Sequence, residues 1–123
     1  MKEIGRFNVT REQLDEIFTE GHTSIAINTM VGKPISVAGF AIYDNEDKEG
    51  SKSLKIIDDV GRDYYTGSQV FIKNFILYAQ SFEDDAFPIT ITPSEGTAKS
   101  SGKKYYSIEE APTSNSNWRD IKF

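Results

Sequence analysis

The sequence predicts a mainly β fold that also contains two helices, and three observations support this class. Five short segments are rich in β-branched and aromatic residues, with the apolar–polar alternation typical of strands. Two other segments repeat apolar residues at helical spacing. The chain has 123 residues, of which 37% are hydrophobic, so it fits a single domain with one modest core.

The first helix is expected over residues 10–21. The Thr10 hydroxyl can accept a hydrogen bond from the Gln13 N–H while the Gln13 side chain accepts one from Thr10, which is a capping box. An apolar stripe follows at helical spacing and ends before Gly21, a typical helix stop; it consists of Leu14, Ile17 and Phe18.

Three strands are expected after this helix. They cover residues 24–28, 35–43 and 53–58, and residues 64–66 extend the third strand or pair with it after a turn at Gly61. The second strand is the longest, and Gly39 in its middle predicts a bulge or a tight bend.

A second helix and a hairpin complete the expected order. The helix covers residues 68–82, and its aromatic stripe is wide enough for burial on more than half of its circumference. Residues 87–92 alternate as a strand, residues 96–102 form a flexible loop, and residues 103–109 form the return strand of the hairpin.

Five strands with a helix between the third and the fourth match the OB barrel, a five-stranded, partly open Greek-key barrel. In that fold the helix closes one end of the barrel. The alternative is an α+β sandwich with the same elements in another strand order. We expect residues 1–111 to form one OB-like domain that includes the N-terminal helix, and residues 112–123 to form a polar tail with one tryptophan, Trp118.

Composition excludes several classes of protein. The absence of cysteine removes disulfides and thiolate chemistry, and it favours a cytoplasmic location. No apolar run has the length of about 20 residues that a membrane helix needs, and the first residues lack the apolar core of a signal peptide. The formal net charge of −5 argues against a protein that coats duplex DNA by bulk electrostatics.

No catalytic, metal or cofactor site is expected. His22, the one histidine, follows a helix-ending glycine and is read as a surface or capping side chain. No glycine-rich segment has phosphate-loop spacing. The acidic loop of residues 44–50 lacks the spacing of a calcium-binding EF-hand. We therefore expect a protein that is not an enzyme and holds no cofactor.

The hairpin carries a basic and aromatic segment inside an acidic protein. Lys99, Lys103 and Lys104 occur there without an acidic residue between Gly96 and Tyr106. Alternation places Lys103 and Tyr105 on the outer face and Tyr106 in the core. Lysines neutralise phosphates and an aromatic ring stacks on a base, which is the combination that single-stranded nucleic acid needs. The alternative is that Tyr105 packs on a neighbouring loop and the lysines protect an exposed strand edge.

The middle strands add further candidates for the same nucleic-acid-binding site. Strand alternation lets one ring of Phe40 and Tyr43, and one of Tyr64 and Tyr65, face outward, and it does not decide which. Trp118 could stack on a base, dock on the barrel or anchor a partner. The whole candidate set comprises Phe40, Tyr43, Lys52, Lys55, Arg62, Tyr64, Tyr65, Lys99, Lys103, Lys104 and Tyr105.

Three segments resemble the small single-stranded DNA-binding proteins of tailed phages of Gram-positive bacteria. They are Val31-Gly32-Lys33-Pro34 before the long strand, Ser68-Gln69-Val70-Phe71-Ile72-Lys73-Asn74-Phe75 in the second helix, and the hairpin Pro88-Ile89-Thr90-Ile91-Thr92 … Glu95-Gly96-Thr97 … Ser100-Ser101-Gly102-Lys103-Lys104-Tyr105-Tyr106. The resemblance implies an OB fold and sequence-independent binding of single strands. It also implies a role in replication or recombination of phage DNA in the host cytoplasm, beside replication or recombination proteins. Binding roles carry over to Lys103, Lys104 and Tyr105, and to Lys55 and Tyr64 or Tyr65. The end of the chain, Trp118–Phe123, lacks the strongly acidic tip through which bacterial single-strand binders recruit partners, so recruitment through the tail is not expected.

The leading hypothesis is therefore a non-enzymatic, sequence-independent single-stranded DNA-binding protein. The alternative is a small protein-binding or inhibitor module that uses its acidic surface, residues 44–49 and 83–85, against a basic partner. An RNA-binding OB domain would differ only in its preference for the 2′-hydroxyl.

Overall fold

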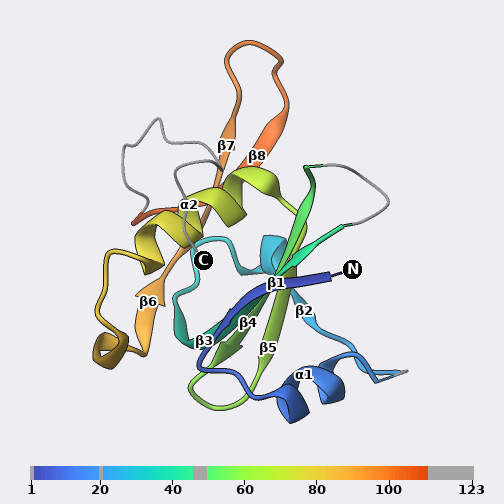
Figure 1. Cartoon of the computed structure of the whole chain (residues 1–123). Coiled ribbons are helices and arrows are strands. Elements are labelled where there is room, and N and C mark those ends of the chain that lie inside the picture. The colour runs from blue at the N-terminus through green and yellow to red at the C-terminus, as the bar shows by residue number, and fades with distance from the viewer. Residues whose placement is uncertain (1, 20, 46–49, 111–123) are drawn as a thin grey trace.

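The computed structural model describes residues 2–19, 21–45 and 50–110 (Figure 1). In chain order its elements are β1 (Lys2–Phe7), α1 (Arg11–Ile17), β2 (Ile25–Ala26), a 3-10 turn η1 (Ile27–Met30), β3 (Ile35–Asp44), β4 (Lys52–Asp58), β5 (Asp63–Thr66), α2 (Gln69–Ala79), a second 3-10 turn η2 (Asp84–Ala86), β6 (Ile89–Ile91), β7 (Pro93–Thr97) and β8 (Lys104–Ile108). The predicted class, strands with two helices, is confirmed.

Most strands belong to one six-stranded sheet built around the long strand β3. The order is β1-β3-β4-β5-β2, and β6 also pairs with β3. β1 pairs with residues 40–44 of β3 and β6 with residues 35–37, while β4 pairs antiparallel with β3 from Val37 to Asp44. β7 and β8 form a separate two-stranded hairpin, which projects from the body of the protein in Figure 1. Within the described residues these strands do not close into a barrel, so the predicted five-stranded barrel is not confirmed.

Gly39 marks an irregularity in β3, as the sequence predicts. The pairing register between β3 and β4 shifts between Val37 and Gly39. A β-carbon at Gly39 would lie 2.5 Å from the backbone oxygen of Asn8, so only glycine allows the end of β1 to approach so closely.

Each face of the sheet packs against a different helix. The main core joins α2 to Leu54, Ile56 and Tyr64, and the α2 residues buried in it are Phe71, Ile72, Phe75, Ile76 and Ala79. A second, smaller core joins Leu14 and Ile17 of α1 to Ala41, Tyr43 and Ile57. Strand alternation separates the two sets because successive side chains point to opposite faces.

The helices match their predicted starts and are shorter than expected. α1 begins after Thr10, and the predicted capping box is present: the Gln13 N–H donates to Thr10 Oγ1 at 3.1 Å, and the Thr10 N–H donates to Gln13 Oε1 at 2.8 Å. α2 is capped by Ser68. The two helices end at Ile17 and Ala79, before the predicted ends at residues 21 and 82.

Three strand predictions are corrected by the structure. β1 was not expected, because Lys2–Phe7 mixes charged residues and glycine and finds its partner only in β3. The strand expected at residues 24–28 shrinks to β2, followed by η1. The partner of the return strand is β7, and the segment around β6 pairs with β3 instead. Pro93 lacks an N–H donor and stands where the chain leaves one sheet for the other. The predicted tail of residues 112–123 lies outside the described residues.

Candidate nucleic-acid interface

Lys55 and Tyr65 form a stacked pair on the face of the sheet that α1 partly covers. They are cross-strand neighbours in β4 and β5, which places both side chains on one face. The Lys55 ammonium lies 4.5 Å from the centre of the Tyr65 ring and 5.3 Å from that of Phe18, within the range of cation–π attraction. Lys55 is only 8% exposed, whereas Tyr65 is 39% exposed. Lys55 therefore orients an exposed ring more than it offers its own charge to a phosphate.

Burial also changes the protonation chemistry of Lys55. Loss of solvent lowers the pKa of the Lys55 ammonium, and the nearby carboxylate of Asp63 opposes this shift without cancelling it. The ammonium keeps one oxygen partner, because Lys55 Nζ donates to Ser24 Oγ at 3.3 Å.

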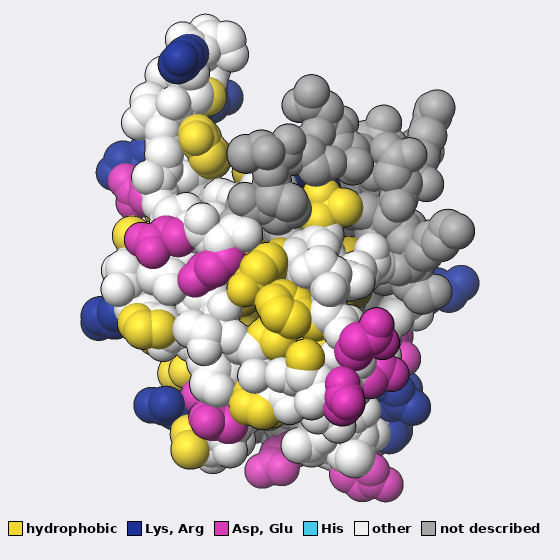
Figure 2. All heavy atoms as spheres, turned by 90° about the vertical axis from the view of Figure 1, so that its left-hand side faces the viewer, with side chains coloured by type: hydrophobic (Ala, Val, Ile, Leu, Met, Phe, Trp, Pro, Cys, Tyr) yellow, Lys and Arg dark blue, Asp and Glu magenta, His cyan; other side chains and the backbone are white. Residues whose placement is uncertain are grey.

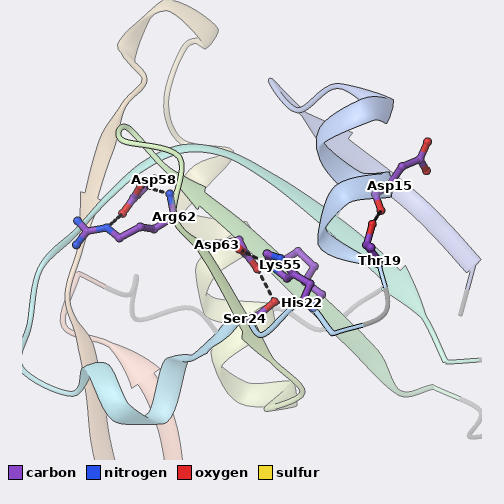
Figure 3. A network of polar contacts seen from close by, with 8 residues as sticks. All are labelled: Asp15, Thr19, His22, Ser24, Lys55, Asp58, Arg62 and Asp63. Atoms are coloured by element: carbon purple, nitrogen blue, oxygen red, sulfur yellow. Dashed lines mark hydrogen bonds and ion pairs between the residues drawn. The ribbon is translucent and has the colours of Figure 1, made fainter.

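A polar network beside Lys55 ties the segment after α1 to β5 (Figure 3). Asp63 lies between two partners: His22 Nε2 is 2.8 Å from Asp63 Oδ1, and Ser24 Oγ donates to Asp63 Oδ2. Serine, histidine and aspartate are also the residues of a hydrolase triad, but there the serine hydroxyl donates to the imidazole. Here it donates to the carboxylate. His22 is thus a partner of Asp63, and its contact with the carboxylate leaves Ser24 bonded to Asp63 and not to the imidazole.

Tyr65 also lines a cleft that reaches β8 of the hairpin. The cleft has a volume of about 240 Å³, and its walls are residues 26–28, residues 65–68 and Tyr106. We call it the tyrosine cleft. The sequence places Tyr106 in the core, and the side chain does pack against the main core while it also lines this cleft. Alternation identified the face of Tyr106 correctly, but it could not show that β5 borders the same space.

Tyr105 points to the opposite face of the hairpin from Tyr106. It pairs with Gly96 across the hairpin, and its ring lies so close that a β-carbon on Gly96 would be 2.5 Å from Tyr105 Cζ. The side chain nevertheless remains 39% exposed, as the alternation predicts. The Tyr105 ring is thus backed by Gly96 and separated from the tyrosine cleft by the thickness of the hairpin.

The hairpin lysines are all exposed. Lys99 stands near the tip and Lys103 precedes β8. Lys104 Nζ lies 3.4 Å from Glu95 Oε1, an ion pair in which the lysine side chain is 70% exposed. A pair this exposed contributes little to stability, so both charges stay accessible to other partners.

Several predicted candidates have structural roles instead. The Phe40 ring packs edge-on against Phe75 at 5.1 Å in the main core, and Tyr43 is buried in the second core. Lys52 pairs with Asp44 at 3.1 Å. These three positions offer no free ring or surface charge comparable with Tyr65 or the hairpin.

Tyr64 and Arg62 both converge on Asp58. The buried Tyr64 hydroxyl donates to Asp58 Oδ2 at 2.8 Å, and Arg62 Nε donates to the same oxygen at 2.8 Å. Of the Tyr64–Tyr65 pair, Tyr65 is therefore the ring that faces outward. The Arg62 side chain is largely exposed but lies outside the tyrosine cleft.

The structure brings the candidate residues into two groups, the Lys55–Tyr65 pair with the tyrosine cleft and the hairpin with its lysines.

In the described part of the chain, no cluster of side chains could hold a metal ion. No helix there is long and apolar enough to cross a membrane. Comparison with protein families, curated proteins and solved structures finds no match to this chain.

Proposed function

We propose that this protein binds single-stranded DNA without sequence preference and catalyses no reaction. The observation that carries the proposal is the exposed Tyr65 ring, held by the Lys55 ammonium at 4.5 Å and bordering a cleft that it shares with Tyr106. Bases stack on Tyr65 and enter the tyrosine cleft, while the hairpin lysines contact phosphates. Stacking on aromatic rings tolerates any base, and it contributes about 1–3 kcal/mol per base.

The connectivity of the sheet supports an open form of the OB barrel as the fold behind this function. The long strand β3 pairs with β4 and β6, β4 pairs with β5, and α2 connects β5 to β6. In OB domains, the strands that correspond to β4 and β5 and the hairpin after the helix bind nucleic acid. The Lys55–Tyr65 pair and the basic hairpin occupy these two places.

The biological setting is a second part of the proposal. The resemblance to phage single-strand binders supports a role in replication or recombination of phage DNA. The net charge of −5 fits a protein that avoids duplex DNA and relies on a local groove.

The test is fluorescence anisotropy with a labelled oligo-dT of about 30 nucleotides, a length that spans one or more OB-type sites. We expect tight binding to this strand and weaker binding to the matching duplex. Tyr65→Ala should weaken binding by about 10-fold, the loss of roughly one stacked base. Tyr65→Phe keeps the ring and should bind as the original protein does.

Three outcomes would contradict the proposal. No binding of either probe at micromolar protein would overturn it, and equal affinity for duplex would exclude a single-strand site. Tighter binding of oligo-U than of oligo-dT would make the ligand RNA. If Tyr65→Ala and Tyr65→Phe bind equally well, the Tyr65 ring does not stack on a base.

A further inference from the structure

Phe18 presents an exposed aromatic ring at the end of α1. It is the C-cap residue of this helix and is 46% exposed, whereas Leu14 and Ile17 of the same apolar stripe are 3% and 8% exposed. The Tyr43 ring meets Phe18 edge-on at 5.3 Å between ring centres, which fixes one side of the Phe18 ring. The stripe therefore buries two of its three members and leaves the third ring in contact with solvent.

The Lys55 ammonium connects this ring to the ring of Tyr65. It lies 4.5 Å from the centre of Tyr65 and 5.3 Å from the centre of Phe18, so both rings lie on the same side of the sheet. The two ring centres can be no further apart than these distances taken together, which is about three nucleotides of a stacked strand at roughly 3.4 Å each. A strand that places one base on Tyr65 can therefore place a second base on Phe18.

The surface beside the Phe18 ring is concave. A hollow of about 360 Å³ lies there between β1, α1 and β3, and Leu14 and Tyr43 also line it. Small-ligand sites usually measure about 300–1,000 Å³. The hollow is thus large enough for a planar group to lie against the ring.

The charged side chains around this hollow are paired. Arg11 Nε lies 3.5 Å from Asp15 Oδ1, and Arg6 Nε lies 3.9 Å from Glu3 Oε2. Each of the two carboxylates that line the hollow thus has a guanidinium beside it. This arrangement suits an uncharged base better than a phosphate.

The hairpin is the place where phosphates find accessible positive charge. In Figure 2 it stands out from the body with a basic side chain at its tip, whereas acidic side chains border the hydrophobic ones on the body. Lys99, Lys103 and Lys104 are all exposed. The lysines can therefore supply the charge for binding while rings on the body supply stacking.

We propose that Phe18 is a second binding site for a nucleobase and acts together with Tyr65 on one strand. This site rests on the proposed function, since it holds a further base of the same bound strand. Lys55 keeps the two rings at a fixed separation, and successive bases of a single strand stack on such rings. The bases of a duplex are already covered by their neighbours, so only an unpaired strand can use both rings.

Phe18→Leu tests this site, because leucine keeps an apolar side chain beside Tyr43 and Lys55 but has no ring. Binding of a labelled oligo-dT of about 30 nucleotides should weaken about 5-fold to 10-fold, the loss of one stacked base. The loss should be equal at low and moderate salt, since stacking releases no counterions. Phe18→Tyr keeps the ring and should bind as the original protein does. Val60→Ala, at an exposed apolar residue in the turn after β4, is the matched control and should leave binding unchanged.

The double variant Phe18→Leu/Tyr65→Ala separates stacking on Phe18 from support of Lys55. If Phe18 stacks a base of its own, the double variant should bind about 5-fold more weakly than Tyr65→Ala alone. Photocrosslinking of the unaltered protein to an oligo-dT that contains iododeoxyuridine gives an independent readout, because this base attaches to the rings on which it stacks. Mass spectrometry should find the attachment at both Phe18 and Tyr65.

Four results would overturn the proposal. Unchanged affinity of Phe18→Leu, with weaker binding by Tyr65→Ala, would remove Phe18 from the site and leave the proposed function standing. A double variant that binds no more weakly than Tyr65→Ala would mean that Phe18 only positions Lys55. Crosslinks at Tyr65 without any at Phe18 would show that no base reaches the second ring. If the unaltered protein does not bind oligo-dT, the proposed function and this site are both wrong.

Discussion

The missing side chain of Gly96 determines where the ring of Tyr105 lies. The two residues are directly opposite across the hairpin, and the ring occupies the space that a β-carbon would need. An aromatic ring that covers a cross-strand glycine is a recognised way to stabilise a strand pair. One side of the Tyr105 ring is thus covered by backbone, and the rest is available to a base.

Gly96→Ala should therefore disturb Tyr105 without unfolding the protein. The added methyl group displaces the far end of a side chain that can rotate away, so we expect the melting temperature to change little. Binding of oligo-dT should weaken about as much as in Tyr105→Ala, roughly 5-fold to 10-fold for one stacked base. The double variant Gly96→Ala/Tyr105→Ala should lose no more than Tyr105→Ala alone, because both changes act on the same ring. Additive losses in this cycle would show that Gly96 acts by another route.

At the scale of single side chains, strand alternation predicted the face to which a side chain points but not the residues that it contacts. It placed Tyr105 outward and Tyr106 inward, and both side chains lie so. It could not predict that Phe18 of the first helical segment reaches Lys55, or that His22 meets Asp63, because these partners lie far apart in sequence. The second core, which buries Tyr43, is unpredictable from alternation for the same reason.

The turn between β4 and β5 is organised by one buried carboxylate. Asp58 accepts hydrogen bonds from the N–H groups of Val60 and Arg62 at 3.1 and 2.8 Å, and its other oxygen accepts bonds from the Arg62 and Tyr64 side chains. Burial disfavours the ionised carboxylate, but these hydrogen bonds together outweigh burial and lower the pKa of Asp58. The turn precedes Tyr65, so Asp58 also sets the geometry of the candidate interface.

The lowered pKa of Asp58 predicts a loss of stability in acid. A carboxyl group whose folded pKa is below its unfolded value of about 3.9 stabilises the fold above that pH, and the contribution disappears as the pH falls through the folded pKa. Asp58→Asn should reduce the free energy of unfolding at pH 7 by about 2–3 kcal/mol, the range for a lost charged hydrogen-bond partner. The difference between the two proteins should shrink below pH 4, as measured by urea unfolding at several pH values.

The neighbouring Asp59 provides the control for this experiment. Asp59 is exposed, so Asp59→Asn should unfold with the same pH dependence as the original protein. A deficit of Asp58→Asn that persists undiminished at pH 2 would show that packing, and not the charge of Asp58, carries the effect.

At the scale of elements, the sequence predicted what is encoded locally. The capping box of Thr10 and Gln13 depends on neighbouring residues, and the glycine at position 39 is itself the signal for an irregular strand; both features were found. β1 and β7 contain charged residues, glycine or proline, and they become strands only because β3 and β8 supply hydrogen bonds. Each segment pairs with a strand that is distant in sequence or has no strand pattern of its own, so the residues within the segment do not predict that it forms a strand.

For the whole molecule, the uneven distribution of charge predicts how binding responds to salt. The protein carries a net charge of −5, whereas the hairpin exposes three lysines. Each phosphate contact on a single strand contributes a slope of about −0.7 in log K against log salt, so three contacts predict roughly −2. Replacement of Lys99, Lys103 and Lys104 by glutamine should weaken oligo-dT binding and flatten this slope.

Lys2 is the matched control for the charge experiment. It is exposed on β1, an edge strand of the main sheet on the opposite side from β5 and β2. Lys2→Gln should leave both the affinity and the slope unchanged. An unchanged slope in the triple variant would mean that phosphates are neutralised elsewhere on the protein.

The position of β3 has a consequence for how the chain is made. Its half from Phe40 to Asp44 meets β1 early, whereas the half from Ile35 to Val37 pairs with β6, which leaves the ribosome much later. A nascent chain that has reached residue 66 contains all the strands from β1 to β5. It still lacks α2, which covers the main-core face of the sheet, and β6, which pairs with the first half of β3. An unpaired strand edge beside an uncovered apolar face invites association with other chains. The interval of synthesis between residues 66 and 91 is therefore when this fold most needs protection by a chaperone.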